Sequence, residues 1–181
     1  MIDATSASDG RDSQSQISER TLTILDVALL TDARAFLRGD YLPKIERCLD
    51  ILGEEDVWWR ANPGSNSIGN LILHLDGSTR SWILGVAGGR RVVRDRDAEF
   101  SERGPLAKSA LLARLRATLA EADEVLAVLD EATLLERRPS SKGEVTVLWA
   151  VLHGVEHFAM HTGQIIMLTK LRTAAVLRLG D

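Results

Sequence analysis

Apolar residues recur at every third or fourth position along four stretches of the chain, which is the spacing of a helix that buries one face. These stretches predict helices over about residues 32–52, 66–85, 105–130 and 146–172. Gly39 and Pro43 lie inside the first stretch and are expected to interrupt it, because both residues disfavour a straight helix interior. Since signals for β-strands are weak, the pattern predicts an all-α protein that folds as an up-down four-helix bundle.

Local signals set the ends of these helices. An Asn-Pro-Gly turn precedes the second helix, where Ser65 or Asn66 is expected to cap the free backbone N–H groups. A glycine-rich segment ends that helix. The charged, aperiodic stretch 90–104 predicts a long loop between the second and third helices, and Pro105 suits the first turn of the third.

Composition indicates one soluble domain and argues against several classes of partner. Of the 181 residues, 45% are hydrophobic and 27% are charged, as in water-soluble globular proteins. We expect a disordered N-terminal tail over residues 1–25 and a single domain over residues 26–181. The net charge of -4 and the lack of a basic stripe argue against nucleic acid. No apolar stretch approaches the roughly 20 residues that cross a membrane, so no membrane association is expected.

The histidines are the most informative residues of the chain. His74 lies in the second predicted helix, while His153, His157 and His161 follow one another at four-residue steps in the fourth. Four residues advance a helix by about 400°, so His157 and His161 stand on one face about 6 Å apart, close enough to bind one cation. With His74 as a third ligand, they would form a metal site with positions left open for water or substrate, as catalytic metal sites have.

Two other interpretations of the histidines stay open at this point. A single helical histidine is more often a packed or exposed side chain than a ligand, so the bundle could be free of metal, with its histidines in the core. His153 could support a neighbouring ligand or simply pack, instead of binding metal itself. The small or polar neighbours of His74, among them Asn70, Gly77 and Ser78, favour a wet pocket between the second and fourth helices.

Two segments of the chain resemble a known family. The sequences NSIGNLILHL and HGVEHFAMHTGQI are similar to the two signature stretches of the DinB-like superfamily, and the resemblance extends over about residues 31–172. It implies a metal-binding four-helix bundle with His74, His157 and His161 as the metal ligands. The C-terminal sequence AAVLRLGD departs from the family pattern, which usually has an aromatic tail.

The resemblance also implies a function. The superfamily includes bacillithiol transferases and other thiol-dependent enzymes, so we expect a metal-dependent thiol S-transferase or hydrolase that acts on a small-molecule substrate, with a low-molecular-weight thiol as a further cofactor. Imidazole ligands suit several divalent metals; zinc is expected first, and nickel, copper, iron and manganese are alternatives. The competing hypothesis is a non-catalytic binding or stress-response bundle that the metal stabilises. Apolar bundle faces, where exposed, would allow a homodimer.

Other residues support weaker hypotheses. The segment Arg94–Phe100 could form a lid whose charges orient an anionic or zwitterionic substrate, although a self-paired, solvated loop is favoured. Trp58, Trp59, Trp82 and Trp149 could line a pocket, but packing in the core or at an interface is favoured for each.

Cys48 is the only cysteine of the sequence. It can form no internal disulfide, so nothing requires an oxidising compartment and a cytoplasmic location is predicted. Because its neighbours in sequence are apolar, we expect an inert buried thiol and not a nucleophile.

Overall fold

The structure is a computed structural model that describes residues 25–174 and residue 177. The predicted N-terminal tail, residues 1–25, lies outside the described residues except for Leu25, which is already helical. Most of the C-terminal AAVLRLGD segment also lies outside them. The division of the chain into a tail and one domain therefore stays a prediction.

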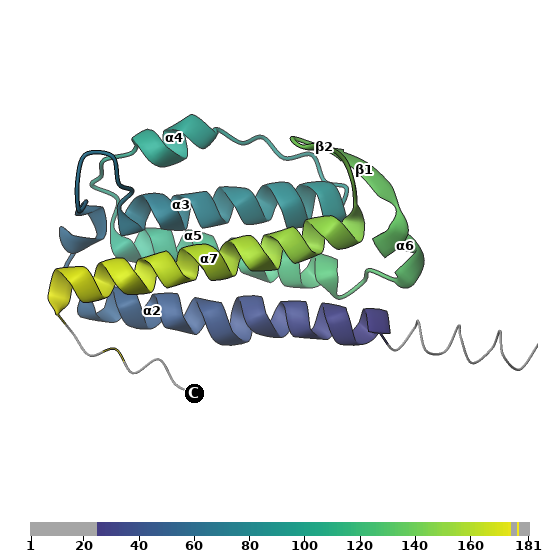
Figure 1. Cartoon of the computed structure of the whole chain (residues 1–181), viewed down its shortest axis with the longest axis horizontal. Helices are drawn as coiled ribbons and strands as arrows, with labels where there is room; N and C mark the ends of the chain where they lie inside the picture. Colours follow the sequence, from purple (N-terminus) through teal and green to yellow (C-terminus); the bar gives the residue numbers. More distant parts are fainter. Residues whose placement is uncertain (1–24, 175–176, 178–181) are drawn as a thin grey trace, which may run out of the picture.

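Helices make up most of the described part of the chain, which confirms the all-α prediction (Figure 1). Among the described residues, none of the helices has the length and apolar character needed to cross a membrane. The first long helix covers residues 25–51 and consists of a regular helix over 25–34, the π-helix η1 Ala35–Tyr41 and α2 Leu42–Ile51. The second is α3 Ile68–Thr79, which the π-helix η3 Arg80–Ala87 extends. The third and fourth are α5 Lys108–Leu126 and α7 Val147–Thr173.

The first helix continues past Gly39 and Pro43, but its regular α-helical geometry is interrupted there, as predicted, by the π-helix η1. Pro43 lies in the first turn of α2, and the preceding turns widen into η1. A π-helical turn shifts the backbone bonding by one residue: the N–H of Leu42 donates to the carbonyl of Leu37. This wider turn accommodates a residue that has no N–H to donate and whose ring would crowd a regular preceding turn.

Contacts along the helices show the direction in which each one runs. Asp76 in α3 accepts hydrogen bonds from Arg114 and Thr118 of α5, each at 2.6 Å. Arg80, one turn further along the same helix, pairs with Glu121, which lies further along α5. The residue numbers rise together, so α3 and α5 run parallel.

The first and last long helices also run parallel to each other. Tyr41 stacks on Phe158, and Asp56, just beyond α2, pairs with Arg172 near the end of α7. The predicted up-down order is therefore wrong between the second and third helices. The connection 88–107 is long enough to return along the outside of the bundle, so that both helices start at the same end (Figure 1).

This connection is not the unstructured loop that its charged sequence predicts. It contains the short helix α4 Arg96–Ser101, whose cap Asp95 accepts a hydrogen bond from the backbone N–H of Ala98. The earlier connection, between α2 and α3, also contains a short element, the single 3-10 turn η2 Asp56–Trp58. Elements this short have too few residues to show a periodic pattern.

The connection between α5 and α7 also holds regular structure. The short helix α6 Glu131–Leu135 leads into an antiparallel hairpin of β1 Arg137–Ser140 and β2 Gly143–Thr146, in which Arg137 lies opposite Thr146. The hairpin was not predicted from the sequence. The third helix begins at Lys108 instead of Pro105.

α3 is the central helix of the bundle. All of its 12 residues are buried, because α5, α7 and α4 cover it on different sides. The burial includes polar side chains, which need hydrogen-bond partners inside the protein. These polar residues are Asn70, His74, Asp76, Ser78 and Thr79.

Cys48 lies in the apolar core, as predicted, and is fully buried. Burial raises the pKa of its thiol. A protonated thiol is a poor nucleophile, so the inert interpretation fits the structure.

Candidate metal centre

The start of α3 is fixed by a reciprocal pair of hydrogen bonds. Ser67 Oγ accepts from the backbone N–H of Asn70, and Asn70 Oδ1 accepts from the backbone N–H of Ser67. Such a pair needs a polar side chain three residues after the cap. Neither Ser65 nor Asn66 is followed by one, so the prediction that one of them caps the helix is wrong.

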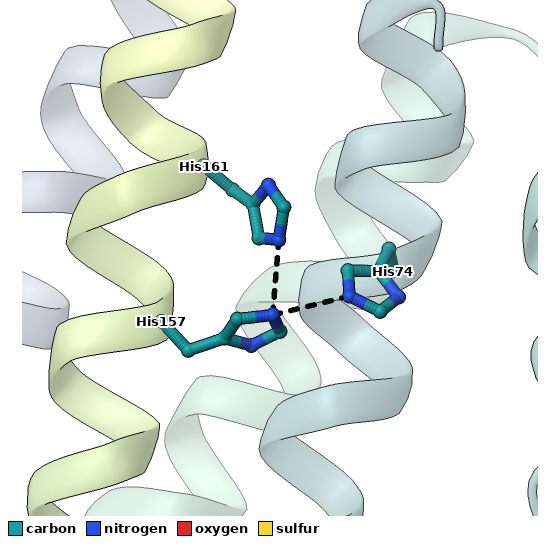
Figure 2. A group of neighbouring side chains, drawn as sticks. All are labelled: His74, His157 and His161. Carbon is teal, nitrogen blue, oxygen red and sulfur yellow. Dashed lines mark hydrogen bonds between the residues drawn. The ribbon is translucent and has the colours of Figure 1, made fainter.

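Three histidines meet between α3 and α7 (Figure 2). His74 comes from α3, and His157 and His161 come from successive turns of α7. The Nε2 atom of His157 lies 3.2 Å from Nε2 of His74 and 2.9 Å from Nε2 of His161. His74 and His161 are buried and His157 is partly buried. The structure thus brings together the three histidines that the sequence singled out.

The other ring nitrogen of each histidine faces an oxygen atom. The carboxylate of Glu99 and the amide oxygen of Gln164 can only accept, so the Nδ1 atoms that face them carry protons. Their Nε2 atoms then present lone pairs toward the centre of the group. The Nδ1 contacts are His74 with Glu99 Oε2 at 2.8 Å, His157 with Ser78 Oγ at 2.7 Å, and His161 with Gln164 Oε1 at 2.7 Å.

The hydroxyl of Ser78 lets this network close in two ways, because a hydroxyl both donates and accepts. If Ser78 donates to His157 Nδ1, then His157 Nε2 carries a proton that faces both His161 Nε2 at 2.9 Å and His74 Nε2 at 3.2 Å, and the group can form without an ion. If Ser78 accepts from His157 Nδ1, all three Nε2 lone pairs converge. Such an arrangement is stable only around a cation.

The surroundings of the two α7 histidines favour their neutral forms. Burial, helped by the repulsion that a protonated His161 or His74 would exert, lowers the pKa of His157 to about 3. Burial also lowers the pKa of His161, although its hydrogen bond to Gln164 acts in the opposite direction. Since imidazole binds metal only when it is neutral, near neutral pH both side chains are in the form that can act as a ligand.

The spacing of the nitrogens fits one transition-metal ion. Zinc lies about 2.0–2.1 Å from its nitrogen ligands, so two nitrogens at ligand angles of about 90–110° lie about 2.9–3.4 Å apart. The two Nε2 separations of 2.9 and 3.2 Å fall in this range. Imidazole is also a common ligand of zinc, nickel, copper and iron. The buried group could therefore hold a divalent metal ion.

A carboxylate that the sequence did not single out lies behind His74. Glu99 on α4 is buried and accepts hydrogen bonds from Arg94 Nε at 2.6 Å and Arg94 Nη2 at 2.7 Å. Arg94 Nη2 also lies 3.0 Å from His74 Nδ1, a proximity that follows from the shared carboxylate, because this nitrogen already carries a proton. Burial by itself would raise the pKa of Glu99, but the hydrogen bonds from Arg94 and His74 outweigh it and the pKa is lowered.

The segment Arg94–Phe100 is only partly the solvated loop favoured by its sequence, because residues 95–98 are exposed whereas Glu99 is buried. The predicted self-pairing is present in the Arg94–Glu99 ion pair. The pair is mostly buried against His74, and the ring of Phe100 lies 4.6 Å from the His74 ring, centroid to centroid. The segment thus covers one side of the histidine group.

Gly77, one turn after His74, makes room for this carboxylate. A Cβ atom at this position would lie 2.8 Å from Glu99 Cδ and 2.9 Å from Arg94 Nε, closer than real side chains allow. A glycine inside a buried helix, one turn from a candidate ligand, is the sequence signal that could have indicated a close neighbour here.

His153 lies outside the group of three. Its ring stacks on His157 with centroids 5.5 Å apart and on Trp149 at 4.8 Å, while Trp82 meets it edge-on at 4.7 Å. Its contact with Glu156 is long, at 3.5 Å. The structure therefore gives His153 a packing contact with a candidate ligand. Burial lowers the pKa of His153.

The other tryptophans contact different parts of the fold. The Trp58 ring packs against Gly69 and Gly104, and Arg172 lies over the ring of Trp59. Packing, the favoured interpretation, thus holds for Trp58 and for the buried Trp82.

A helical bundle that gathers three imidazoles between two of its helices belongs to a class of scaffold suited to metal binding. The family model of the DinB superfamily matches residues 43–165, a segment that contains all three histidines. The chain belongs to the DinB superfamily.

A solved structure has a similar fold. The crystal structure of a conserved protein from Enterococcus faecalis is similar with a TM-score of 0.62 and 16% sequence identity, over 85% of this chain and 98% of that chain. At this identity the likeness concerns the fold alone. None of the curated proteins matches the chain.

Proposed function

We propose that His74, His157 and His161 bind one divalent metal ion, zinc first and nickel, iron or manganese as alternatives. We further propose that the protein is a metal-dependent enzyme of the thiol S-transferase or hydrolase type. The observation that supports metal binding most is the convergence of three Nε2 atoms from two helices, with each Nδ1 facing an oxygen atom. Membership of the superfamily supports the same site. It supports the reaction only weakly, because one fold carries many reactions.

The residues of the chain have separable roles in this proposal. The bound ion would supply Lewis-acid chemistry that lowers the pKa of water or of a thiol. Ser78 and Gln164 hold the rings of the α7 histidines in place through their Nδ1 atoms. Trp149 and Met160 share one side of α7 with His157 and are partly exposed, so a small-molecule substrate that approaches His157 would meet apolar side chains there.

Elemental analysis of the purified protein tests the metal. We expect about one equivalent of metal in the wild type and loss of most of it in His157→Ala and His161→Ala, because two remaining ligands chelate poorly. His74→Ala should do the same while circular dichroism shows nearly unchanged helicity, since the apolar core does not include that ring. Retention of a full equivalent by any of these variants would contradict the ligand set.

A turnover assay tests the reaction. The metal-loaded and chelator-treated proteins would be incubated with a low-molecular-weight thiol and an electrophilic acceptor, and with ester substrates, while free thiol and released acid are followed. We expect turnover of one substrate class that is lost with the chelator and restored by metal.

A non-catalytic, metal-stabilised bundle is the second candidate. It is favoured by the burial of His74 and His161 and by their position between α3 and α7, where an ion would brace the fold. A metal-loaded protein with a raised melting temperature and no turnover of any thiol acceptor or ester would support this candidate. A homodimer also stays a prediction.

A further inference from the structure

Glu99 approaches the histidine group from a part of the chain that contributes none of the three histidines. It belongs to α4, in the connection that returns along the outside of the bundle (Figure 1). Glu99 is only 6% exposed, and its carboxylate contacts His74 on one side and Arg94 on the other. An ionised carboxylate at this depth is costly unless it is paired and hydrogen-bonded. The two contacts together satisfy that requirement.

The position of α4 relative to His74 is fixed by Asn70, one turn earlier on α3. Asn70 Nδ2 donates to the backbone carbonyl of Glu99 at 2.8 Å and to that of Glu102 at 3.0 Å. Arg60 donates to Asn70 Oδ1 at 2.6 Å and to the carbonyl of Phe100 at 3.3 Å. These bonds satisfy carbonyls at the end of α4, which have no partner within so short a helix. Asn70 therefore holds Glu99 level with His74.

We propose that Glu99 is a positioning residue of the metal centre and that Arg94 orients its carboxylate toward His74. By accepting the proton of His74 Nδ1, Glu99 selects the tautomer in which Nε2 is free to bind metal, and it fixes the plane of the ring. Its negative charge also offsets part of the charge of the ion. The inference rests on the proposed metal binding and deepens it, because the affinity of the site then depends on a separate segment that itself binds no metal.

The test compares substitutions at two positions of α4. Glu99→Leu removes the acceptor and the charge, Glu99→Gln keeps an acceptor but removes the charge, and Asp97→Asn removes the same charge from an exposed position on the same helix. Zinc affinity would be measured by competition with a chromophoric chelator at about pH 7.5. Loss of a partner behind a ligand typically weakens metal binding about 10–100-fold, so we expect that loss for Glu99→Leu, a several-fold loss for Glu99→Gln, and less than about a two-fold change for Asp97→Asn.

A second readout uses the metal-free protein. Nitrogen NMR of labelled histidines distinguishes a ring protonated at Nδ1 from one protonated at Nε2. We expect His74 to carry its proton on Nδ1 in the wild type and to lose this preference in Glu99→Leu. A merely structural role for Glu99 would change the melting temperature and leave the tautomer as it is.

The outcomes separate this inference from the proposal on which it rests. If the wild type binds zinc and Glu99→Leu binds it equally well with an unchanged His74 tautomer, the inference is wrong and the metal site stands. If the wild type binds no transition metal, the proposed function is wrong, and the inference falls with it. Should Glu99→Leu fail to fold, Glu99→Gln carries the comparison, and zinc affinity equal to that of Asp97→Asn would overturn the inference.

Discussion

His153 and His157 are one helical turn apart, yet their surroundings differ. His157 directs Nε2 toward two other imidazoles, whereas His153 stacks between aromatic rings. We therefore expect His153→Ala to weaken zinc binding less than about 10-fold, below the loss typical of a partner that is hydrogen-bonded to a ligand. Isothermal titration of both alanine variants would measure this. An equal loss in the two variants would make His153 a ligand.

The sequence predicted the candidate ligands for a physical reason that did not extend to Glu99. Helix geometry alone places His157 and His161 on one face, and the small or polar neighbours of His74, together with the family resemblance, indicated the third ligand. Glu99 lies in a charged segment whose acidic residues look alike in the sequence, and it becomes distinct only when α4 docks and Gly77 leaves space for it. Burial of a carboxylate is a tertiary property that local patterns do not carry.

Protonation of His157 should make the stability of the metal-free protein depend on pH. Its pKa is about 3 in the folded protein against an ordinary value of 6.5, so between these values the unfolded chain binds more protons. The free energy of unfolding should therefore fall as the pH drops below about 6.5, by at most about 1.4 kcal/mol per pH unit for one such group. The lowered pKa of His161 acts in the same direction.

Urea unfolding of chelator-treated protein at several pH values between about 7 and 4.5 would measure this slope. His157→Gln, which cannot titrate there, is the control and should show a shallower dependence. Equal slopes for the wild type and this variant would show that His157 is not shielded from protons in the folded state.

At the scale of the elements, the side chain of Asn70 both caps the start of α3 and binds the covering helix α4. Asn70→Ala removes half of the reciprocal cap and two hydrogen bonds to α4. We expect a loss of about 2–4 kcal/mol in the free energy of unfolding, the sum of a cap and the buried hydrogen bonds. Asn66→Ala, at a position predicted to cap but found outside the cap, should change it by less than about 0.5 kcal/mol. Chemical denaturation of both variants would decide between the two caps.

The elements also show which structural features apolar periodicity can predict and which it cannot. Apolar spacing revealed each long helix, because a buried stripe persists over many turns. The spacing did not show whether neighbouring helices run parallel or antiparallel, since an apolar stripe can pack against a neighbour in either orientation. The parallel placement of α3 and α5 is visible only in contacts such as those of Asp76 with Arg114 and Thr118. The segments α4, α6 and the hairpin were too short to leave a pattern.

At the scale of the whole molecule, zinc should stabilise the fold over a wider pH range than ordinary histidines would allow. A ligand at 100 times its dissociation constant adds about 2.7 kcal/mol when it binds only the folded state. Ordinary histidines, with pKa values near about 6.5, would release metal below about pH 6. Because the pKa values of His157 and His161 are lowered, competition by protons should begin at lower pH.

Thermal melts with zinc and with chelator would test this at about pH 7.5, 6 and 5. We expect zinc to raise the melting temperature at the first two values by similar amounts and less at the third. Identical curves with zinc and chelator at pH 7.5 would argue that the site binds no metal. Loss of the zinc effect already at pH 6 would contradict the lowered pKa values.

The separation of the ligands along the chain sets the order in which the centre is assembled during synthesis. His74 and His157 are 83 residues apart, and α7 is the last helix of the described chain. When α3 leaves the ribosome, α7, which later covers it, has not yet been synthesised. An ion that needs both helices can therefore be loaded only after translation has passed His161 and α7 has docked. Metal insertion would then be a late maturation step on an already folded bundle, and cells short of metal would accumulate a folded but empty protein.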